Sequence, residues 1–252
     1  MEKKRKNVLI ITHYFWPEDF KINELALGLS VKYNVSVLTG NPSYPTKYHF
    51  KNFKKKRLNN LSIFRVPVYK RGKSNLSIFL NYLTFLFSLP LFGLFLLKGK
   101  NFDFIFVYQP SPVTVGLTGI IFKYFKNCRM ALWINDLWPD TIDHVNSDLG
   151  IFSAILRQSK FIFRLITNII YRYTDYILVQ SQGFKKKIKQ KKFKKKIHFF
   201  PNWIDTTKYK KKKIDKKYKT ILKSKIFKLM YFGNIGYSQD FHGVIKILKV
   251  LK

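Results

Sequence analysis

One carboxylate stands where it could handle a proton. Asp136 directly follows a strand predicted over Arg129–Ile134, so its side chain should point into a cleft. There it could orient or deprotonate an acceptor hydroxyl group. The alternative is that Asp136 caps the short helix that follows. Trp138, two residues later, either packs against a sugar or lipid or anchors the loop before Pro139.

The segment after the first predicted strand offers a second set of polar groups. His13 stands at the end of that strand, where it either contacts a substrate or is a satisfied core histidine. Trp16, before Pro17, has the same two interpretations as Trp138: a surface for sugar or lipid, or a loop anchor. His13 and Trp16 are therefore candidate substrate contacts.

The start of the first predicted helix is a candidate site for an anion. Glu18, Lys21 and Asn23 lie there, and free backbone N–H groups at a helix start favour a phosphate. Lys21 would add positive charge, unless it is an ordinary solvated lysine.

A glycine turn near the end of the sequence could approach a diphosphate closely. Gly233, Asn234 and Gly236 follow a strand predicted over Phe227–Phe232 and precede a helix predicted over Phe241–Leu251. Glycines in such a turn let the backbone come near phosphate oxygens. The short Gly-x-x-Gly pattern gains weight from its position after a strand.

The elements that must position these residues alternate between strand and helix. Strands are predicted at Val8–Tyr14, Val35–Thr39, Ile63–Val68, Phe104–Tyr108, Arg129–Ile134, Tyr176–Val179 and Ile197–Phe200. Helices are predicted at Ile22–Lys32, Val113–Tyr124 and Ile155–Tyr173. This alternation indicates an α/β fold with a Rossmann-like, doubly wound parallel sheet. Ligands should then bind at the carboxyl ends of the strands, at His13–Glu18, Gly40–Pro45, Gln109–Pro112, Asn135–Asp140 and Gln180–Gly183.

Charge and apolar segments divide the chain further. Residues 1–205 are predicted to form an N-terminal domain, 206–226 a Lys-rich linker, and 227–252 the start of an incomplete second domain.

The uncharged stretch Leu76–Leu97 is long enough to span a bilayer. It either lies in the membrane interface, packs in the core or spans. We favour the interface, with Phe85, Phe87, Phe92 and Phe95 contacting lipid.

The composition narrows the possible partners. The 252 residues include 48 Lys and Arg against 13 Asp and Glu, a formal net charge of +35, which suggests an anionic partner. The competing explanation is codon bias, because Lys, Phe, Tyr, Ile and Asn are all favoured by AT-rich codons. Arginine, the usual reader of bases, is scarce, so a specific nucleic-acid role ranks last. The single Cys128 excludes an internal disulfide and suits a reducing cytoplasm.

Several ordered motifs resemble a known family. They are His13-Tyr14-Phe15-Trp16-Pro17-Glu18, Lys21-Ile22-Asn23-Glu24-Leu25, Val37–Pro45, Asp136-Leu137-Trp138-Pro139-Asp140, Pro201-Asn202-Trp203-Ile204-Asp205 and Tyr231–Gln239. Together they are similar to the N-terminal half of family 4 glycosyltransferases, of the group that builds lipopolysaccharide, capsule and colanic-acid-type polysaccharides.

The resemblance implies a GT-B fold and a metal-independent reaction, usually with retention of anomeric configuration. A sugar would pass from a nucleotide-sugar to a polyprenyl-diphosphate-linked or saccharide acceptor at the cytoplasmic face of the membrane. No cofactor or metal is expected. Asp136 would be catalytic, the residues near the first strand and Trp138 would hold substrate, and the Gly233 turn would touch the donor phosphate.

The resemblance also implies a missing part. Family members carry a full C-terminal domain with a Glu-x7-Glu element, which we expect to be absent here, so that a separate C-terminal half chain would have to supply it. The alternative hypothesis is a non-catalytic, membrane-associated acceptor-binding module or a decayed gene fragment. We expect the chain alone to transfer no sugar.

Overall fold

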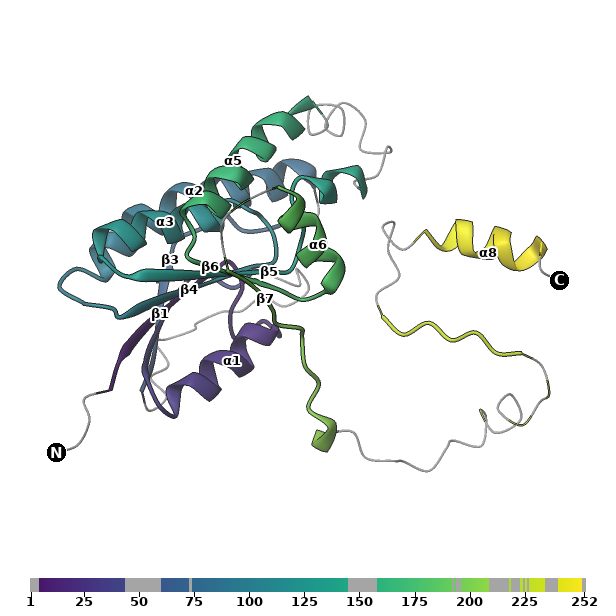
Figure 1. Cartoon of the computed structure of the whole chain (residues 1–252), viewed down its shortest axis with the longest axis horizontal. Coiled ribbons are helices and arrows are strands. Elements are labelled where there is room, and N and C mark those ends of the chain that lie inside the picture. Colours follow the sequence, from purple (N-terminus) through teal and green to yellow (C-terminus); the bar gives the residue numbers. More distant parts are fainter. Residues whose placement is uncertain are drawn as a thin grey trace. The chain divides into compact units, whose positions relative to one another are not determined.

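A seven-stranded, fully parallel sheet forms the centre of the protein (Figure 1). The computed structural model describes residues 5–43, 60–72, 74–144, 158–191, 193, 196–208, 218, 223, 225, 227–233 and 240–250. The strand order is β3-β2-β1-β4-β5-β6-β7. The predicted α/β, Rossmann-like doubly wound parallel sheet is therefore confirmed.

Most of the strands are buried because helices cover both faces of the sheet. Their bounds are β1 Asn7–Thr12, β2 Asn34–Gly40, β3 Leu61–Val66, β4 Phe104–Gln109, β5 Arg129–Ile134, β6 Tyr176–Val179 and β7 Lys196–Phe199. In β1, β4 and β5 the last five residues are all buried. These three strands are mainly apolar, as two-sided burial requires, whereas three of the four residues of β7 are exposed. All seven strands lie within two residues of their predicted bounds.

The helices divide between the two faces. Helix α1 (Lys21–Ser30) covers one face, whereas α2 (Asn75–Leu96), α3 (Val115–Phe125) and α5 (Lys160–Tyr173) cover the other (Figure 1). Helix α3 lies between α2 and α5 and contacts both. Helix α6 (Gln182–Gln190), which we did not predict, packs beside β6 and β7. Short 3-10 turns are η1 (Asp140–His144) and η3 (Thr206–Lys208).

Helix α2 is one uninterrupted helix despite Pro90 and Gly93. A Cβ atom at Gly93 would lie 2.6 Å from Leu38 Cδ2, so the glycine allows the helix to approach β2 closely. Phe85 and Leu89 face inward and are fully buried. Placing Phe85 in contact with lipid was therefore wrong, because the ring belongs to the core.

The outward face of α2 is exposed and apolar. By length and composition α2 is the only helix among the described residues that could span a membrane, yet only 22% of its apolar window is buried. Its flanking strands β3 and β4 belong to one sheet, so a single crossing of a bilayer does not fit. The core interpretation therefore holds for the inward face of α2, whereas its outward face is exposed.

The chain divides into two units, Met1–Asn202 and Trp203–Lys252. The second contains α8 (Phe241–Val250), close to the predicted helix. The predicted strand Phe227–Phe232 is wrong: these residues are exposed and pair with no strand in the described part of the chain. Apolar composition alone does not make a strand, which needs a hydrogen-bonded neighbour. Most of the predicted linker, and the first residues of the helix predicted from Ile155, lie outside the described residues.

Candidate functional site

The order in which strands are added to the sheet reverses between β1 and β4, which is the topological switch point of the sheet. From β1 the chain continues through β2 to β3 on one side, and from β4 it continues through β5 to β7 on the other. The crevice at the carboxyl ends of two such strands is the usual ligand site in open α/β sheets. His13 follows β1 and Ser111 follows β4, so both stand at this point. The five predicted loops follow the carboxyl ends of β1, β2, β4, β5 and β6, although residues 44–45 of the loop after β2 lie outside the described residues.

Asp136 is held by the loop after β4. Its Oδ2 atom accepts a hydrogen bond of 2.8 Å from Ser111 Oγ, and its backbone oxygen accepts one of 3.3 Å from Gln109 Nε2. Burial raises the pKa of Asp136 above its usual value, and the bond from Ser111 partly opposes this. The capping interpretation is not favoured, because the hydrogen bond found for this carboxylate goes to Ser111 and not to a helix N–H group.

Ser111 joins Asp136 to Trp138. Its hydroxyl oxygen also accepts a hydrogen bond of 3.3 Å from Trp138 Nε1. The Trp138 ring packs against Phe163 of α5, with ring centroids 5.0 Å apart. Trp138 is thus partly an anchor of its loop, and its polar edge belongs to the same hydrogen-bonded chain as Asp136. Substrate contact by Trp138 stays a prediction.

Amide side chains extend this edge across β6 and β7. Gln180 Nε2 donates to the backbone oxygen of Asn135 at 2.6 Å, and Asn202 Nδ2 donates to Gln180 Oε1 at 2.9 Å. These amides were not among the predicted site residues. The available signal was their position, because Gln180 directly follows β6 and Asn202 is the third residue after β7.

His13 is buried and neutral. Its ring stacks between Tyr14 and Phe85, at centroid distances of 4.4 and 4.1 Å. Burial, and next the charge of Arg71, lower the pKa of His13 from 6.5 to about 3. Neither ring nitrogen makes a hydrogen bond of standard geometry to the described residues, although the Asn81 side chain and the Ser111 backbone act against the pKa shift. His13 is thus a core histidine whose two ring nitrogens lack a hydrogen bond of standard geometry among the described residues.

Two arginines that we did not predict hold the loops of this edge. Arg71 Nη1 donates to Tyr14 Oη at 2.6 Å and to Tyr82 Oη of α2 at 3.0 Å. Arg65 of β3 donates to the backbone oxygens of Gly40, at 2.8 Å, and of Trp16. Their rarity in a lysine-rich chain was the available signal, because planar guanidinium groups bind several acceptors at once.

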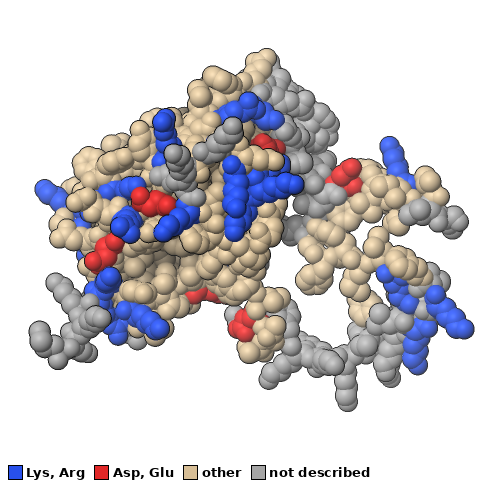
Figure 2. All heavy atoms as spheres, in the orientation of Figure 1, with Lys and Arg blue, Asp and Glu red and all other residues tan. Residues whose placement is uncertain are grey.

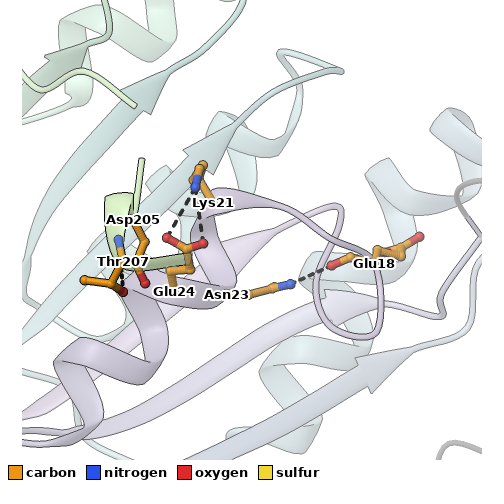
Figure 3. Close-up of polar contacts among 6 residues, drawn as sticks. All are labelled: Glu18, Lys21, Asn23, Glu24, Asp205 and Thr207. Carbon is orange, nitrogen blue, oxygen red and sulfur yellow. Dashed lines mark hydrogen bonds and ion pairs between the residues drawn. The ribbon is translucent and has the colours of Figure 1, made fainter. Parts of the chain in front are cut away.

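Glu18, Asn23 and Lys21 all contact other groups of the protein, and Figure 3 shows the contacts of Asn23 with Glu18 and of Lys21 with Glu24. Glu18 is buried and accepts from the backbone N–H groups of Phe15 at 3.1 Å and Ser43 at 2.8 Å. Asn23 Nδ2 donates to the Glu18 backbone oxygen at 2.6 Å. Lys21 Nζ lies 3.2 Å from Glu24 Oε1 in a partly exposed ion pair. Roles in substrate binding stay predictions, and these contacts show that the three side chains already have structural partners.

The predicted contact of Gly233, Asn234 and Gly236 with a donor phosphate stays a prediction. Gly233 lies in the second unit and is exposed, and Asn234 and Gly236 lie outside the described residues. Trp16 is 37% exposed, which leaves part of its ring open to a ligand. No group of three or more His, Cys, Asp or Glu side chains suited to a metal ion occurs within the described ranges.

No model of a protein family matches the sequence, and no curated protein matches it. Similar solved structures include a UDP-glucosyltransferase from Polygonum tinctorium capable of glucosylating indoxyl, in a complex with 3,4-dichloroaniline. Its identity to this chain is 10% and the TM-score 0.48, and the match covers 81% of this chain and 55% of that one.

A second solved structure, a UGT transferase from Siraitia grosvenorii in complex with UDP, is also 10% identical. The TM-score is 0.45, and the match covers 77% of this chain and 50% of that one. This chain therefore spans about half the length of both proteins. Similarity at these values says nothing about what this chain binds.

Proposed function

We propose that this chain is the acceptor-side half of a nucleotide-sugar-dependent glycosyltransferase of the GT-B type. The observation that carries the proposal is the position of Asp136 at the carboxyl edge of the sheet, bound to Ser111 beside the switch point. The ordered motifs that resemble family 4 glycosyltransferases supply this edge with His13, Trp16 and Trp138 as well. We further propose a reaction with retention in bacterial surface polysaccharide biosynthesis.

Asp136 has the properties of a group that receives or orients a proton. In the proposed step the acceptor oxygen bonds to the anomeric carbon, the bond to the nucleotide diphosphate breaks, and the hydroxyl proton passes to the Asp136 carboxylate or is oriented by it. A raised pKa makes a carboxylate a better base near neutral pH. The bond from Ser111 Oγ occupies one oxygen, Oδ2, and fixes the direction in which Oδ1 points.

The donor and acceptor are proposed by class. The donor is a nucleotide-sugar, and no metal is proposed to bridge its diphosphate. The acceptor is a polyprenyl-diphosphate-linked sugar or a saccharide, met on the inner face of the cell membrane. Firm binding of the donor diphosphate is proposed to come from a C-terminal half, to which the Gly233 turn would belong. Such charge stabilisation at the leaving group is commonly a large part of the rate.

A non-catalytic function is the alternative. His13, Glu18 and Lys21 are engaged in packing or local contacts, and under this alternative Asp136, Trp16 and Trp138 are the groups proposed to hold an acceptor. Under this alternative the chain binds the acceptor and transfers nothing, or it is a decayed fragment that does neither.

The decisive experiment measures sugar transfer with a C-terminal half supplied as a second chain. Radiolabelled nucleotide-sugars are offered with a polyprenyl-diphosphate-linked acceptor in detergent. We expect turnover by the pair, no turnover by this chain alone, and a fall of about 10²–10⁴-fold in kcat for Asp136→Asn.

Asp140→Asn is the matched control. Asp140 lies four residues away, and its carboxylate makes an exposed ion pair with Lys187 at 3.0 Å. We expect this variant to keep near-normal turnover. Full activity of Asp136→Asn would refute the catalytic role, and saturable acceptor binding without any turnover in the complemented pair would establish the binding-module alternative.

A further inference from the structure

The outer surface of the helix layer formed by α2, α3 and α5 carries two apolar stripes. On α2 the outward residues recur at spacings of three or four, and they are Leu76, Phe79, Leu83, Phe87, Leu91 and Phe95. Leu91 is 66% exposed and Phe95 76% exposed. An apolar surface of this extent on a soluble domain usually marks a contact with a protein or a membrane.

Helix α5 has a matching outward stripe that the sequence alone did not separate from its core face. Its inner face buries Thr167, Ile170 and Tyr171. Its outer face exposes the apolar side chains Phe161, Ile162, Leu165, Ile169 and Tyr173. Because α3 contacts both α2 and α5 on the same side of the sheet, the two stripes belong to one helix layer (Figure 1).

The charge around the stripes is mainly positive. The sequences of α2, α3 and α5 contain no Asp or Glu, and Lys160, Arg164 and Arg172 lie within α5. Lys123 of α3 is paired with Asp175, just after α5, at 2.8 Å. Lys98 and Lys100 are exposed just after α2. Basic side chains outnumber acidic ones over the visible side of the sheet unit in Figure 2. Apolar stripes bordered by cations suit an anionic lipid surface.

We propose that the outer surface of α2 and α5, which we call the lipid-facing surface, docks on the anionic headgroups and upper acyl region of a membrane leaflet. Aromatic and aliphatic side chains of both helices would enter the interface, and the bordering lysines and arginines would meet the headgroups. A second copy of this chain is a poorer occupant, because its own cations would face these cations. This inference extends the membrane partner of the proposed function, but it rests on different residues.

Vesicle binding tests the proposal on the full 252-residue chain. Partition is measured by flotation with vesicles of phosphatidylcholine alone and of phosphatidylcholine with phosphatidylglycerol. Two triple variants remove the stripes with helix-compatible glutamine: Phe87→Gln, Leu91→Gln, Phe95→Gln on α2, and Phe161→Gln, Leu165→Gln, Ile169→Gln on α5. We expect each triple variant to bind the anionic vesicles about tenfold more weakly or worse.

The matched control lies on the opposite side of the sheet. Leu27→Gln and Val31→Gln alter exposed apolar residues at α1, and this double variant should bind like the unaltered chain. Arg164→Gln with Arg172→Gln should reduce the preference for anionic vesicles. We expect each variant to fold, because all the altered side chains point outward. Circular dichroism and thermal melts check this.

The outcomes are distinguishable from those of the transfer assay, since vesicle binding needs neither donor nor turnover. Normal binding by either folded triple variant overturns the two-helix surface. Equal binding to neutral and anionic vesicles overturns the role of the cations. Failure to bind vesicles, with a dimer in sedimentation that the triple variants abolish, would assign the surface to a second copy of the chain and overturn the proposal.

Discussion

Replacing Glu18 by alanine should destabilise the fold much more than its place in a surface loop suggests. Glu18 is 2% exposed, and its carboxylate joins two loops, because one oxygen accepts from the N–H of Phe15 and the other from the N–H of Ser43. Burial lowers the pKa of Arg65, and the charge of Glu18 opposes this shift. Glu18 therefore favours the protonated, cationic form of Arg65. The residue thus ties together the segments that follow β1 and β2 beside a half-buried cation.

The expected cost follows from what the substitution leaves behind. A hydrogen bond to a charged group contributes about 1.5–3 kcal/mol, and a buried donor without an acceptor is unfavourable. Two such bonds, together with a weakened environment for Arg65, give a loss of about 3–6 kcal/mol in the free energy of unfolding. For a chain of this size, that corresponds to roughly 6–24 °C in Tm.

Urea denaturation followed by circular dichroism measures this loss, with Glu24→Ala as the control. Glu24 pairs with Lys21 at the partly exposed start of α1, where an ion pair is worth about 0.3–0.5 kcal/mol. Equal effects of the two substitutions would refute the tethering role of Glu18. A Glu18→Gln variant that is as stable as the unaltered chain but fails to bind acceptor would return Glu18 to the substrate-binding residues.

The remaining predictions concern titration and packing. Ser111→Ala removes the hydrogen bond that lowers the pKa of Asp136, so the pKa of Asp136 should rise. The acid limb of the pH–rate profile of the complemented enzyme should then move to higher pH. An unmoved limb would contradict the assignment of Asp136 as the base. The pKa of His13 is lowered from 6.5 to about 3, so the unfolded chain binds this proton first and stability should fall as pH drops from 6.5 towards 3, by up to about 1.4 kcal/mol per pH unit. His13→Phe should flatten that slope in urea titrations at several pH values. Gly119→Ala should destabilise by about 1–3 kcal/mol, because its Cβ would lie 2.5 Å from Val107 Cγ2, whereas Gly28→Ala, with open space around it, should stabilise by about 0.5–1 kcal/mol in thermal melts.

The strands were predictable because burial on both faces leaves a distinctive trace. β5 and β6 begin and end at the predicted residues, and each is a short apolar run bounded by polar or loop residues. The location of the candidate site followed from the same pattern, since the carboxyl ends of parallel strands share one edge. That is why Asp136 and His13 could be placed at this edge without knowledge of any side-chain contact.

The contacts of individual side chains were not predictable, because they join residues far apart in the sequence. Ser111 and Asp136 are 25 positions apart, and Arg71 and Tyr14 are 57 apart. Periodicity shows that a helix such as α5 is apolar, but it does not show which of two apolar faces meets the sheet. For Phe227–Phe232 the apolar run misled us, since pairing depends on a neighbouring strand that local sequence does not reveal.

The central position of β1 has a consequence for synthesis of the chain. Ile10 pairs with Val37 on one side and with Phe106, 96 positions later, on the other. During translation, α2 is therefore complete before β4 emerges to close the sheet, and α3, which packs beside α2, follows later still. A nascent chain in this state exposes a long apolar helix, and such intermediates are prone to associate. Early engagement of α2 by a chaperone or by the membrane itself would protect the growing chain until its second half arrives.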